Sequence, residues 1–296
     1  MAYTTTDLIT AVKAIASIPS SQNLFTTADF LRFANRAMHK KLIPLVLGTR
    51  EEYWVQSYDH SITADRASYV IPSRAIGGKL RDVLWVSGNT ETSLPRLEPE
   101  NIYSTESGRL GFYLEGSKVM LSPTPTTTAD TLRLKHFRRP NTLVAASSCG
   151  LIESIDTNAN TVTLTSTPET FTNGVLIDFV QGGDGHDWRA IDQEITGVSG
   201  TTINFVSLPS DLEVGDYVCI AGESCIPQIP LELLPILEDE VAKMCRHAQG
   251  KKDADADKEL EEDKREILKT LTPRVDGEPK KIIGHATLLN HFRRGR

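Results

Sequence analysis

The sequence lacks the long apolar runs and leader features that direct a chain to a membrane. No apolar stretch approaches the roughly 20 residues needed to cross a bilayer. Residues 1–7 are polar and contain no basic cluster, unlike the start of a signal peptide. We therefore expect neither export by the standard route nor insertion into a membrane.

Cysteine is scarce, and it is not spaced as in common metal sites. The four cysteines have no CxxC spacing and no flanking histidines; they are Cys149, Cys219, Cys225 and Cys245. In a chain of 296 residues without an export signal, this pattern favours reduced thiols over a disulfide between Cys219 and Cys225. A zinc site is expected even less, because tetrahedral zinc usually takes closely spaced Cys and His pairs.

Basic residues are too few for a chain whose main task is to bind nucleic acid. The sequence has 32 Lys and Arg against 39 Asp and Glu, a formal net charge of −7. Sequence-independent DNA binders usually carry an excess of basic residues that displaces counterions. The balance argues against high-affinity DNA binding, but it is compatible with a surface past which DNA slides.

Recognisable catalytic signatures are also missing. Residues 77–79 do not belong to a phosphate loop, because Ser73 stands where the first glycine belongs. Residues 253–257 open like a calcium-binding loop, but Lys258 replaces the turn glycine and Lys264 replaces the bidentate glutamate. No GxSxG elbow is present. We therefore predict no catalytic residue, no cofactor and no metal site, and we expect the protein not to be an enzyme.

The glycine-rich segment 182–188 is the most tempting exception. It places two carboxylates beside a histidine, which could bind a metal ion. No second His-rich or carboxylate-rich segment is visible to complete such a site. We interpret the segment as a hairpin loop with polar turn residues.

Helical periodicity appears at both ends of the chain. Apolar residues recur at helical spacing over 6–17 and again from 26 to Pro44, which kinks or ends the second helix. Near the other end, an apolar stripe over 233–248 stops at Gly250, and a mostly charged helix follows over 254–271. The second helix has a basic outer face, which could line a DNA channel but is more simply a solvated surface; it consists of Arg32, Arg36, Lys40 and Lys41.

Between the helices the pattern changes to β structure. β-branched and aromatic runs separated by turn residues over 53–137 predict antiparallel hairpins. Short alternating runs over 143–222 predict a small barrel or sandwich, inserted between this region and the last helices. The expected fold class is α+β. The domains are a body with two N-terminal and two C-terminal helices and hairpins (1–142 and 223–273), the inserted β module (143–222) and an extended tail (274–296).

The tail differs in composition from the rest of the chain. It has too few apolar residues to fold alone and ends in a basic segment, so it is either disordered or ordered by a partner. A second basic cluster, Lys135, Arg138 and Arg139, follows the hairpin region and could contact an acidic partner.

Six segments are together more informative than any single motif. They are residues 50–55, 71–83, 94–100, 137–141, 226–230 and 272–281. In combination they resemble the head-to-tail connector (adaptor) proteins of podovirus-like tailed bacteriophages. The resemblance covers most of the chain and is weakest over 143–222.

The resemblance implies a structural virion protein that is assembled in the host cytoplasm. Such adaptors form a ring, usually of twelve copies, beneath the portal and around the DNA channel. Its partners would be other copies of the chain, the portal protein and tail nozzle or tail fibre proteins, with DNA passing through unbound and no membrane involved. In related adaptors a carboxy-terminal extension docks onto the portal. The corresponding candidates here are Arg274, Lys280, Lys281, Ile282, Ile283, Phe292, Arg293 and Arg294.

Two other function classes fit less well. A tail-tube or nozzle subunit would usually be richer in β structure and would lack the pair of carboxy-terminal helices. A glycan-binding or hydrolytic tail component would need an aromatic-lined groove with paired carboxylates. Only 6% of the residues are aromatic, and no carboxylate pair is obvious.

Overall fold

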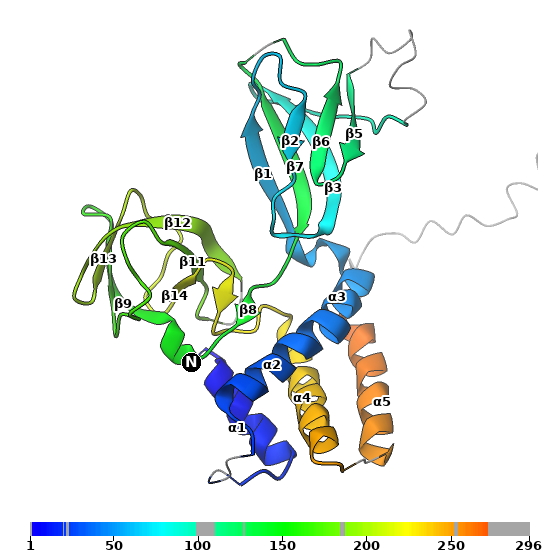
Figure 1. Ribbon diagram of the computed structural model, residues 1–296, viewed down its shortest axis with the longest axis vertical. Coiled ribbons are helices and arrows are strands. Elements are labelled where there is room, and N and C mark those ends of the chain that lie inside the picture. Colours follow the sequence, from blue (N-terminus) through cyan, green and yellow to red (C-terminus); the bar gives the residue numbers. More distant parts are fainter. Residues whose placement is uncertain are drawn as a thin grey trace, which may run out of the picture.

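The computed structural model describes residues 2–19, 21, 24–98, 110–126, 128–183, 187–251 and 254–271. Helices form one end of the molecule, two packed sheets project from that body, and a β barrel lies beside the join (Figure 1). Helices with antiparallel strands confirm the α+β class, and the inserted module contains a closed barrel of six strands rather than a sandwich. No helix in the described part of the chain is long and apolar enough to cross a membrane.

The helical body has its own apolar core. Its helices are α1 (Thr5–Ile15), α2 (Thr27–Ala37), α3 (Ile43–Thr49), α4 (Leu234–Ala248) and α5 (Ala254–Leu271). α1 and α2 each begin with a capping box, in which two side chains accept hydrogen bonds from backbone N–H groups of the first turn. These side chains are Thr4 and Asp7 in α1, and Thr26 and Asp29 in α2. α4 packs against α1, α2 and α5, so the two ends of the sequence share one core.

The N-terminal half contains a third helix that the sequence analysis did not predict. A π-helical segment, Met38–Leu42, joins α2 to α3, and the helical path continues past Pro44 to Thr49. Pro44 lies in the first turn of α3, where its missing N–H would have no partner within that helix. The proline therefore neither ends the helical path nor removes an internal hydrogen bond of α3.

The projecting part consists of two sheets around a second core. One sheet has the order β1-β7-β3-β4 and the other the order β2-β6-β5. Their strands are β1 (Val55–Ser61), β2 (Ser68–Val70), β3 (Ala75–Ser87), β4 (Thr90–Ser93), β5 (Gly111–Glu115), β6 (Lys118–Ser122) and β7 (Thr131–Arg138). Alternate residues point inward, so Tyr69, Val83, Val119 and Leu134 are almost fully buried between the sheets.

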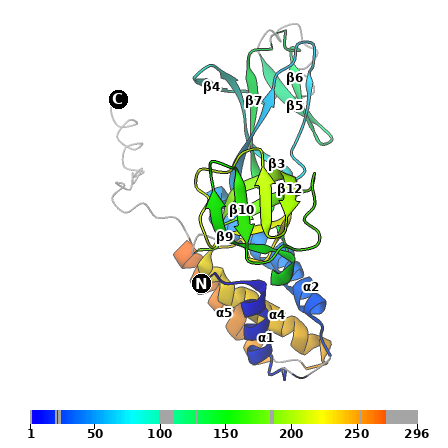
Figure 2. The ribbon, with the colours of Figure 1, turned by 90° about the vertical axis from the view of Figure 1, so that its left-hand side faces the viewer.

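The barrel closes in the order β10-β13-β12-β11-β14-β9 around a third core. Its strands are β9 (Gly150–Asp156), β10 (Thr161–Leu164), β11 (Leu176–Val180), β12 (Trp188–Ser199), β13 (Thr202–Phe205) and β14 (Tyr217–Ile220). Viewed from the barrel side, it lies in front of the join between the helical body and the sheets (Figure 2).

The chain enters and leaves the barrel at one place, which we call the barrel root. There β8 (Thr142–Leu143) and β15 (Glu223–Ser224) pair in parallel. The start of α1 docks on the same place, because the Thr5 amide donates to the Cys225 carbonyl at 2.8 Å and the Thr5 hydroxyl donates to the Val144 carbonyl at 2.9 Å. The root therefore connects the barrel to the helical body.

Candidate functional site: the junction between the modules

A buried carboxylate joins the barrel to the projecting sheets. Asp178 of β11 has no exposed surface, and its Oδ2 accepts hydrogen bonds from Arg74 at 2.6 Å and Asn141 at 2.7 Å. The backbone amides of Gly222 and Asp192 each donate to this carboxylate at 3.0 Å. Arg74 lies just before β3 and Asn141 lies just after β7. One barrel side chain therefore ties the base of the sheets to the barrel.

Two arginines surround this carboxylate. Arg74 also pairs with Asp192 at 2.5 Å, whereas Arg138, at the end of β7, lies with its Nη2 at 3.8 Å from Asp178. The Arg138 guanidinium stacks on the indole of Trp188, 3.6 Å from the ring centroid. Burial lowers the pKa of Arg138 to about 9, against the opposing charge of Asp178, so the group remains cationic at neutral pH.

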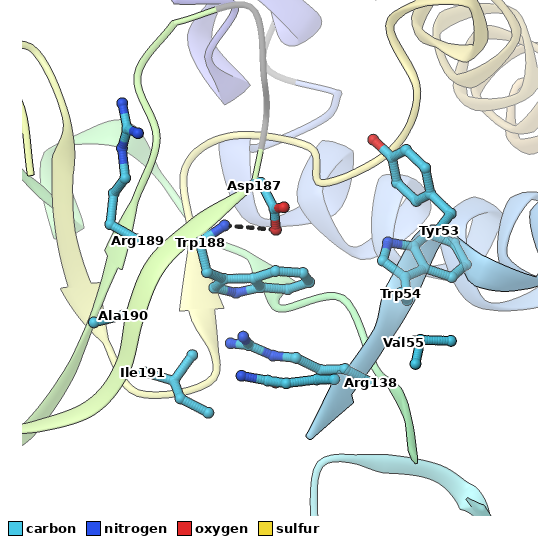
Figure 3. A pocket seen from close by; sticks show the side chains of 10 residues that line it. Tyr53, Trp54, Val55, Arg138, Asp187, Trp188, Arg189, Ala190 and Ile191 are labelled. Atoms are coloured by element: carbon cyan, nitrogen blue, oxygen red, sulfur yellow. Dashed lines mark hydrogen bonds between the residues drawn. The ribbon is translucent and has the colours of Figure 1, made fainter. Parts of the chain in front are cut away.

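A cavity of about 190 Å³ opens beside this pair. Figure 3 shows the Arg138 guanidinium beneath the Trp188 indole, with Tyr53 and Trp54 approaching from the helical body. The buried Arg138 Nε, Trp188 Nε1 and Gln56 Oε1 have no hydrogen-bond partner among the described residues. Such groups usually find water or a ligand, so the cavity is suited to water or to an anionic group near Arg138.

The two aromatic side chains that reach the cavity from the helical body do not supply a base. Burial and then the charge of Asp187 raise the pKa of Tyr53 to about 12, so its phenol stays protonated. Trp54 donates its indole N–H to the Gln228 carbonyl at 3.1 Å, and the side-chain oxygen of Gln228 accepts from the Asn141 amide at 2.8 Å. These contacts fix helical body, sheets and barrel against one another, which is a positioning role.

The predicted basic face of α2 is exposed. Arg32, Arg36, Lys40 and Lys41 are all accessible along α2 and the π-helical segment, and Arg32 pairs with Asp29 at 3.0 Å. Burial lowers the pKa of His39, and the positive charge of Arg139 lowers it further. Arg139 therefore lies in the same region as His39. The described residues thus bring two separately predicted basic clusters together in part.

The prediction that Arg138 contacts an outside partner is wrong. Its side chain is 2% exposed and belongs to the internal junction. Lys135 lies 4.0 Å from Glu91 on the sheet surface, and Arg139 is exposed. Within the described residues, Arg139 is therefore the one member of this cluster that is exposed and has no ion pair.

Several sequence candidates fall wholly or partly outside the described residues. The segment 182–188 is described only at 182–183 and 187–188, and residue 253 of the calcium-like segment is outside. Asp257 from that segment lies in α5 and pairs with Lys243 of α4 at 3.0 Å, which links two helices. The predicted portal-binding residues lie outside the described residues; they are Arg274, Lys280, Lys281, Ile282, Ile283, Phe292, Arg293 and Arg294.

Sequence reasoning missed the junction around Asp178. A signal was present, since Asp178 is the only charged residue in the apolar run of β11, and a carboxylate inside a buried strand requires partners. The partners could not be named, because Arg74 is 104 positions away in the sequence and Asn141 is 37 positions away.

Comparison with known proteins identifies the family. No curated protein sequence matches the chain. The family model described as "SU10 adaptor protein" matches residues 3–180, more than half of the chain. The match runs from the start of the helical body through both projecting sheets to the end of β11. The chain therefore belongs to the SU10 adaptor protein family and is a structural adaptor component of a phage virion.

Proposed function

We propose that this adaptor is a subunit of the ring that joins the portal of a podovirus-like tailed phage to its tail. The observation that carries the proposal is the family match over residues 3–180. The role is mechanical and needs no catalysis. Twelve copies form the ring, as the resemblance implies, and a net charge of −7 lets DNA pass without being held.

Opposite charges on two helices support assembly into a ring. α2 with the π-helical segment carries four basic residues and one acidic residue, whereas α5 carries seven acidic and four basic residues. In a closed ring each subunit offers two different, complementary faces to its neighbours. We assign the contact to the basic face of α2 on one subunit and to α5, which has an excess of acidic residues, on the next. Exposed residues that represent the two faces are Arg36, Lys40, Glu262 and Glu266.

Residues 274–296 anchor the ring to the portal in this proposal. In the sequence they come shortly after α5, which ends at Leu271. A basic segment with scattered apolar residues suits an acidic or grooved partner surface, and ordering on contact gives the joint its direction. The helices then form the ring and channel wall, while the barrel faces the outside or the tail.

The central experiment mixes the full chain with the portal ring of its own phage and determines the mass and image of the product. A discrete ring-on-ring particle that forms only with portal is the expected result, and its mass gives the copy number. Failure to associate, with self-assembly into stacked tubes, would overturn the proposal in favour of a tail-tube or nozzle subunit.

The portal anchor is tested with a chain that lacks residues 274–296. Portal binding should be lost while the remaining chain keeps its helical and β circular-dichroism signal. A full-length variant with Lys280, Lys281, Arg293 and Arg294 each changed to Glu separates charge from length. Unchanged portal binding by the shortened chain rejects the anchoring role of the tail.

The ring contact is tested by exchanging charges. R36E with K40E should reduce the copy number on the portal, and so should E262K with E266K, because each places like charges across the contact. The four changes combined should restore it. If neither pair of changes alters the copy number, the ring contact lies on another surface.

A further inference from the structure

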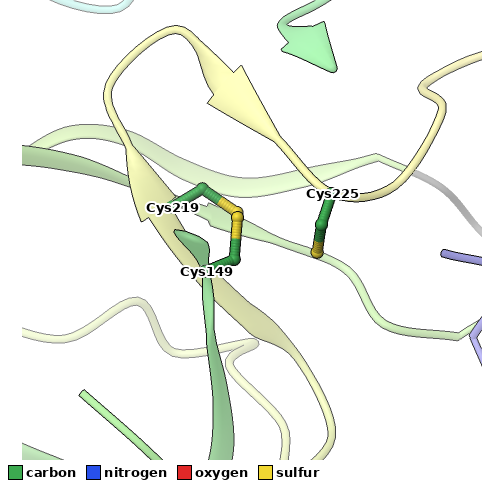
Figure 4. Close-up of side chains that lie close together, drawn as sticks. All are labelled: Cys149, Cys219 and Cys225. Atoms are coloured by element: carbon green, nitrogen blue, oxygen red, sulfur yellow. The ribbon is translucent and has the colours of Figure 1, made fainter. Parts of the chain in front are cut away.

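Three of the four cysteines gather in one buried place at the barrel root. Cys149 lies just before β9, Cys219 lies in β14, and Cys225 follows β15. Their sulfur atoms all lie within 4.8 Å of one another, and Figure 4 shows the Cys225 side chain beside those of Cys149 and Cys219. The three residues are at most 4% exposed, and all three are free thiols. Their separation in the sequence hid this arrangement.

The surroundings of the three sulfurs are apolar. Val180 and Ile226 complete the small core around them, with Tyr217 packed at its side. Three thiols gathered in an apolar pocket form a set of soft sulfur ligands for a cation.

The upper limit of 4.8 Å on the sulfur separations is compatible with a single metal ion bound by all three sulfurs. Metal–thiolate bonds of about 2.3 Å place sulfurs around one ion about 4 Å apart. A disulfide joins only two sulfurs, at about 2.05 Å, and would leave the third without a role. Among the described residues, no histidine or carboxylate joins the group as a fourth ligand.

We propose that Cys149, Cys219 and Cys225 form a three-thiolate site for a thiophilic d10 metal ion, Zn²⁺ or Cu⁺. Soft sulfur ligands select such ions. Each thiol that binds the ion releases its proton to solvent. Cu⁺ would be held by the three sulfurs alone, whereas Zn²⁺ would complete its four-coordinate shell with water or a backbone carbonyl.

The ion would cross-link the strands that begin and end the barrel. Cys149 immediately precedes β9, Cys219 lies in its partner strand β14, and Cys225 belongs to the segment on which α1 docks. Binding therefore fixes the barrel on the helical body at its root. This inference does not depend on the proposed ring or on portal binding.

The test begins with the full chain, purified under reducing conditions without chelators. Elemental analysis should find one Zn²⁺ or Cu⁺ per chain, and which metal is found distinguishes the two ions. Chains stripped of metal should take up one equivalent of added Zn²⁺ or Cu⁺. Added Co²⁺, used as a spectroscopic substitute for Zn²⁺, should give a thiolate-to-metal charge-transfer band.

Cysteine variants locate the site. C225S and C149S should lose the bound metal and the charge-transfer band. C245S is the matched control, since Cys245 is equally buried but lies on α4 in the helical core, and this variant should retain one ion per chain. Circular dichroism checks that each variant folds. If a variant fails to fold, the metal uptake of the wild-type chain tests the proposal instead.

Three results would overturn the inference. The wild-type chain could take up none of the added ions and release four reactive thiols on unfolding. Its mass could be lower by two hydrogens, which would reveal a disulfide between two of the cysteines. C225S could retain as much metal as the wild type, which would place the ion elsewhere.

Discussion

Removing the Asp178 carboxylate should separate the barrel from the projecting sheets. In D178A, Arg74 and Arg138 lose the anion that lies 2.6 Å and 3.8 Å from them, respectively. Asn141 and the amides of Gly222 and Asp192 lose their acceptor at the same time. Arg74 keeps Asp192 and the Asn141 side chain keeps the Glu223 carbonyl, but the buried charge of Arg138 loses its anion and the amides of Gly222 and Asp192 lose their acceptor.

The size of the effect follows from burial. Removing one partner of a buried ion pair costs about 3–5 kcal/mol, because the other charge stays in a poorly solvated place. The side chains of Arg138 and Arg74 are 2% and 17% exposed, so solvent can relieve little of that cost. D192N is the matched control: its carboxylate is 46% exposed and pairs with the same Arg74. We expect it to cost only about 0.2–1 kcal/mol.

Two measurements test this prediction. Urea unfolding followed by tryptophan fluorescence gives the free energy of unfolding, with Trp188 reporting on the junction because it stacks on Arg138. Hydrogen exchange of the Gly222 and Asp192 amides, which donate to Asp178, reports local opening. The reasoning is refuted if D178A unfolds within about 1 kcal/mol of D192N and leaves both amides equally protected.

Three further predictions concern single contacts. K264A leaves Glu240, the buried carboxylate 2.5 Å from Lys264, unpaired, and should lower the free energy of unfolding in urea by about 3–5 kcal/mol. E261Q changes the exposed second partner of Lys264 and should lower it by under about 1 kcal/mol. G182A puts a Cβ 1.8 Å from the Gly215 carbonyl oxygen and should cost about 1–3 kcal/mol, while G183A meets nothing within 4 Å and should be neutral by the same assay. Burial, assisted by Arg138, lowers the pKa of His136 below its usual 6.5, so the unfolded chain binds more protons and stability falls as the pH drops through that value. The melting temperature of H136Q should fall less than that of the wild type between about pH 7.5 and about pH 5.5, and an identical fall would contradict the assignment.

The regular elements could be predicted where local chemistry alone decides them. The Thr26 and Asp29 capping box marks the start of α2, and Gly250, with a φ of 77°, follows the end of α4 as expected for a helix stop. All six barrel strands follow runs that the sequence analysis read as β structure. Their inward residues, such as Ile203 in β13, are apolar and fully buried, which is the alternation that the pattern requires.

Elements without a local signal were missed. β4 has four exposed polar residues and owes its conformation to pairing with β3. The first half of β12, from Trp188 to Gln193, was not predicted as a strand, and its first residue belongs to the segment 182–188 that we interpreted as a hairpin loop. Its pairing with β11, Val180 opposite Trp188 and Ile177 opposite Gln193, makes it a strand. In both places the partner strand, not the local sequence, determines the structure.

The candidate sites were harder to predict than the fold for the same reason. Asp178 collects donors from positions as far apart as Arg74 and Gly222, and the cysteine cluster combines Cys149 with Cys219 and Cys225. Chain connectivity alone places none of these groups together. A lone carboxylate in an apolar strand indicates only that partners exist, and a buried cysteine does not indicate even that.

The chemistry of the junction fits the work of an adaptor better than an apolar contact would. The helical body, the two sheets and the barrel each bury their own apolar core, and the charged groups around Asp178 lie between the sheets and the barrel. A buried ion pair adds little net stability, since desolvation offsets the attraction, but it is satisfied in only one geometry. Apolar surfaces, in contrast, tolerate sliding and repacking. A subunit that must present several surfaces to different neighbours in a virion needs fixed angles between its modules. The directional contacts of Asp178, Arg74 and Arg138 supply that constraint at the point where the modules meet.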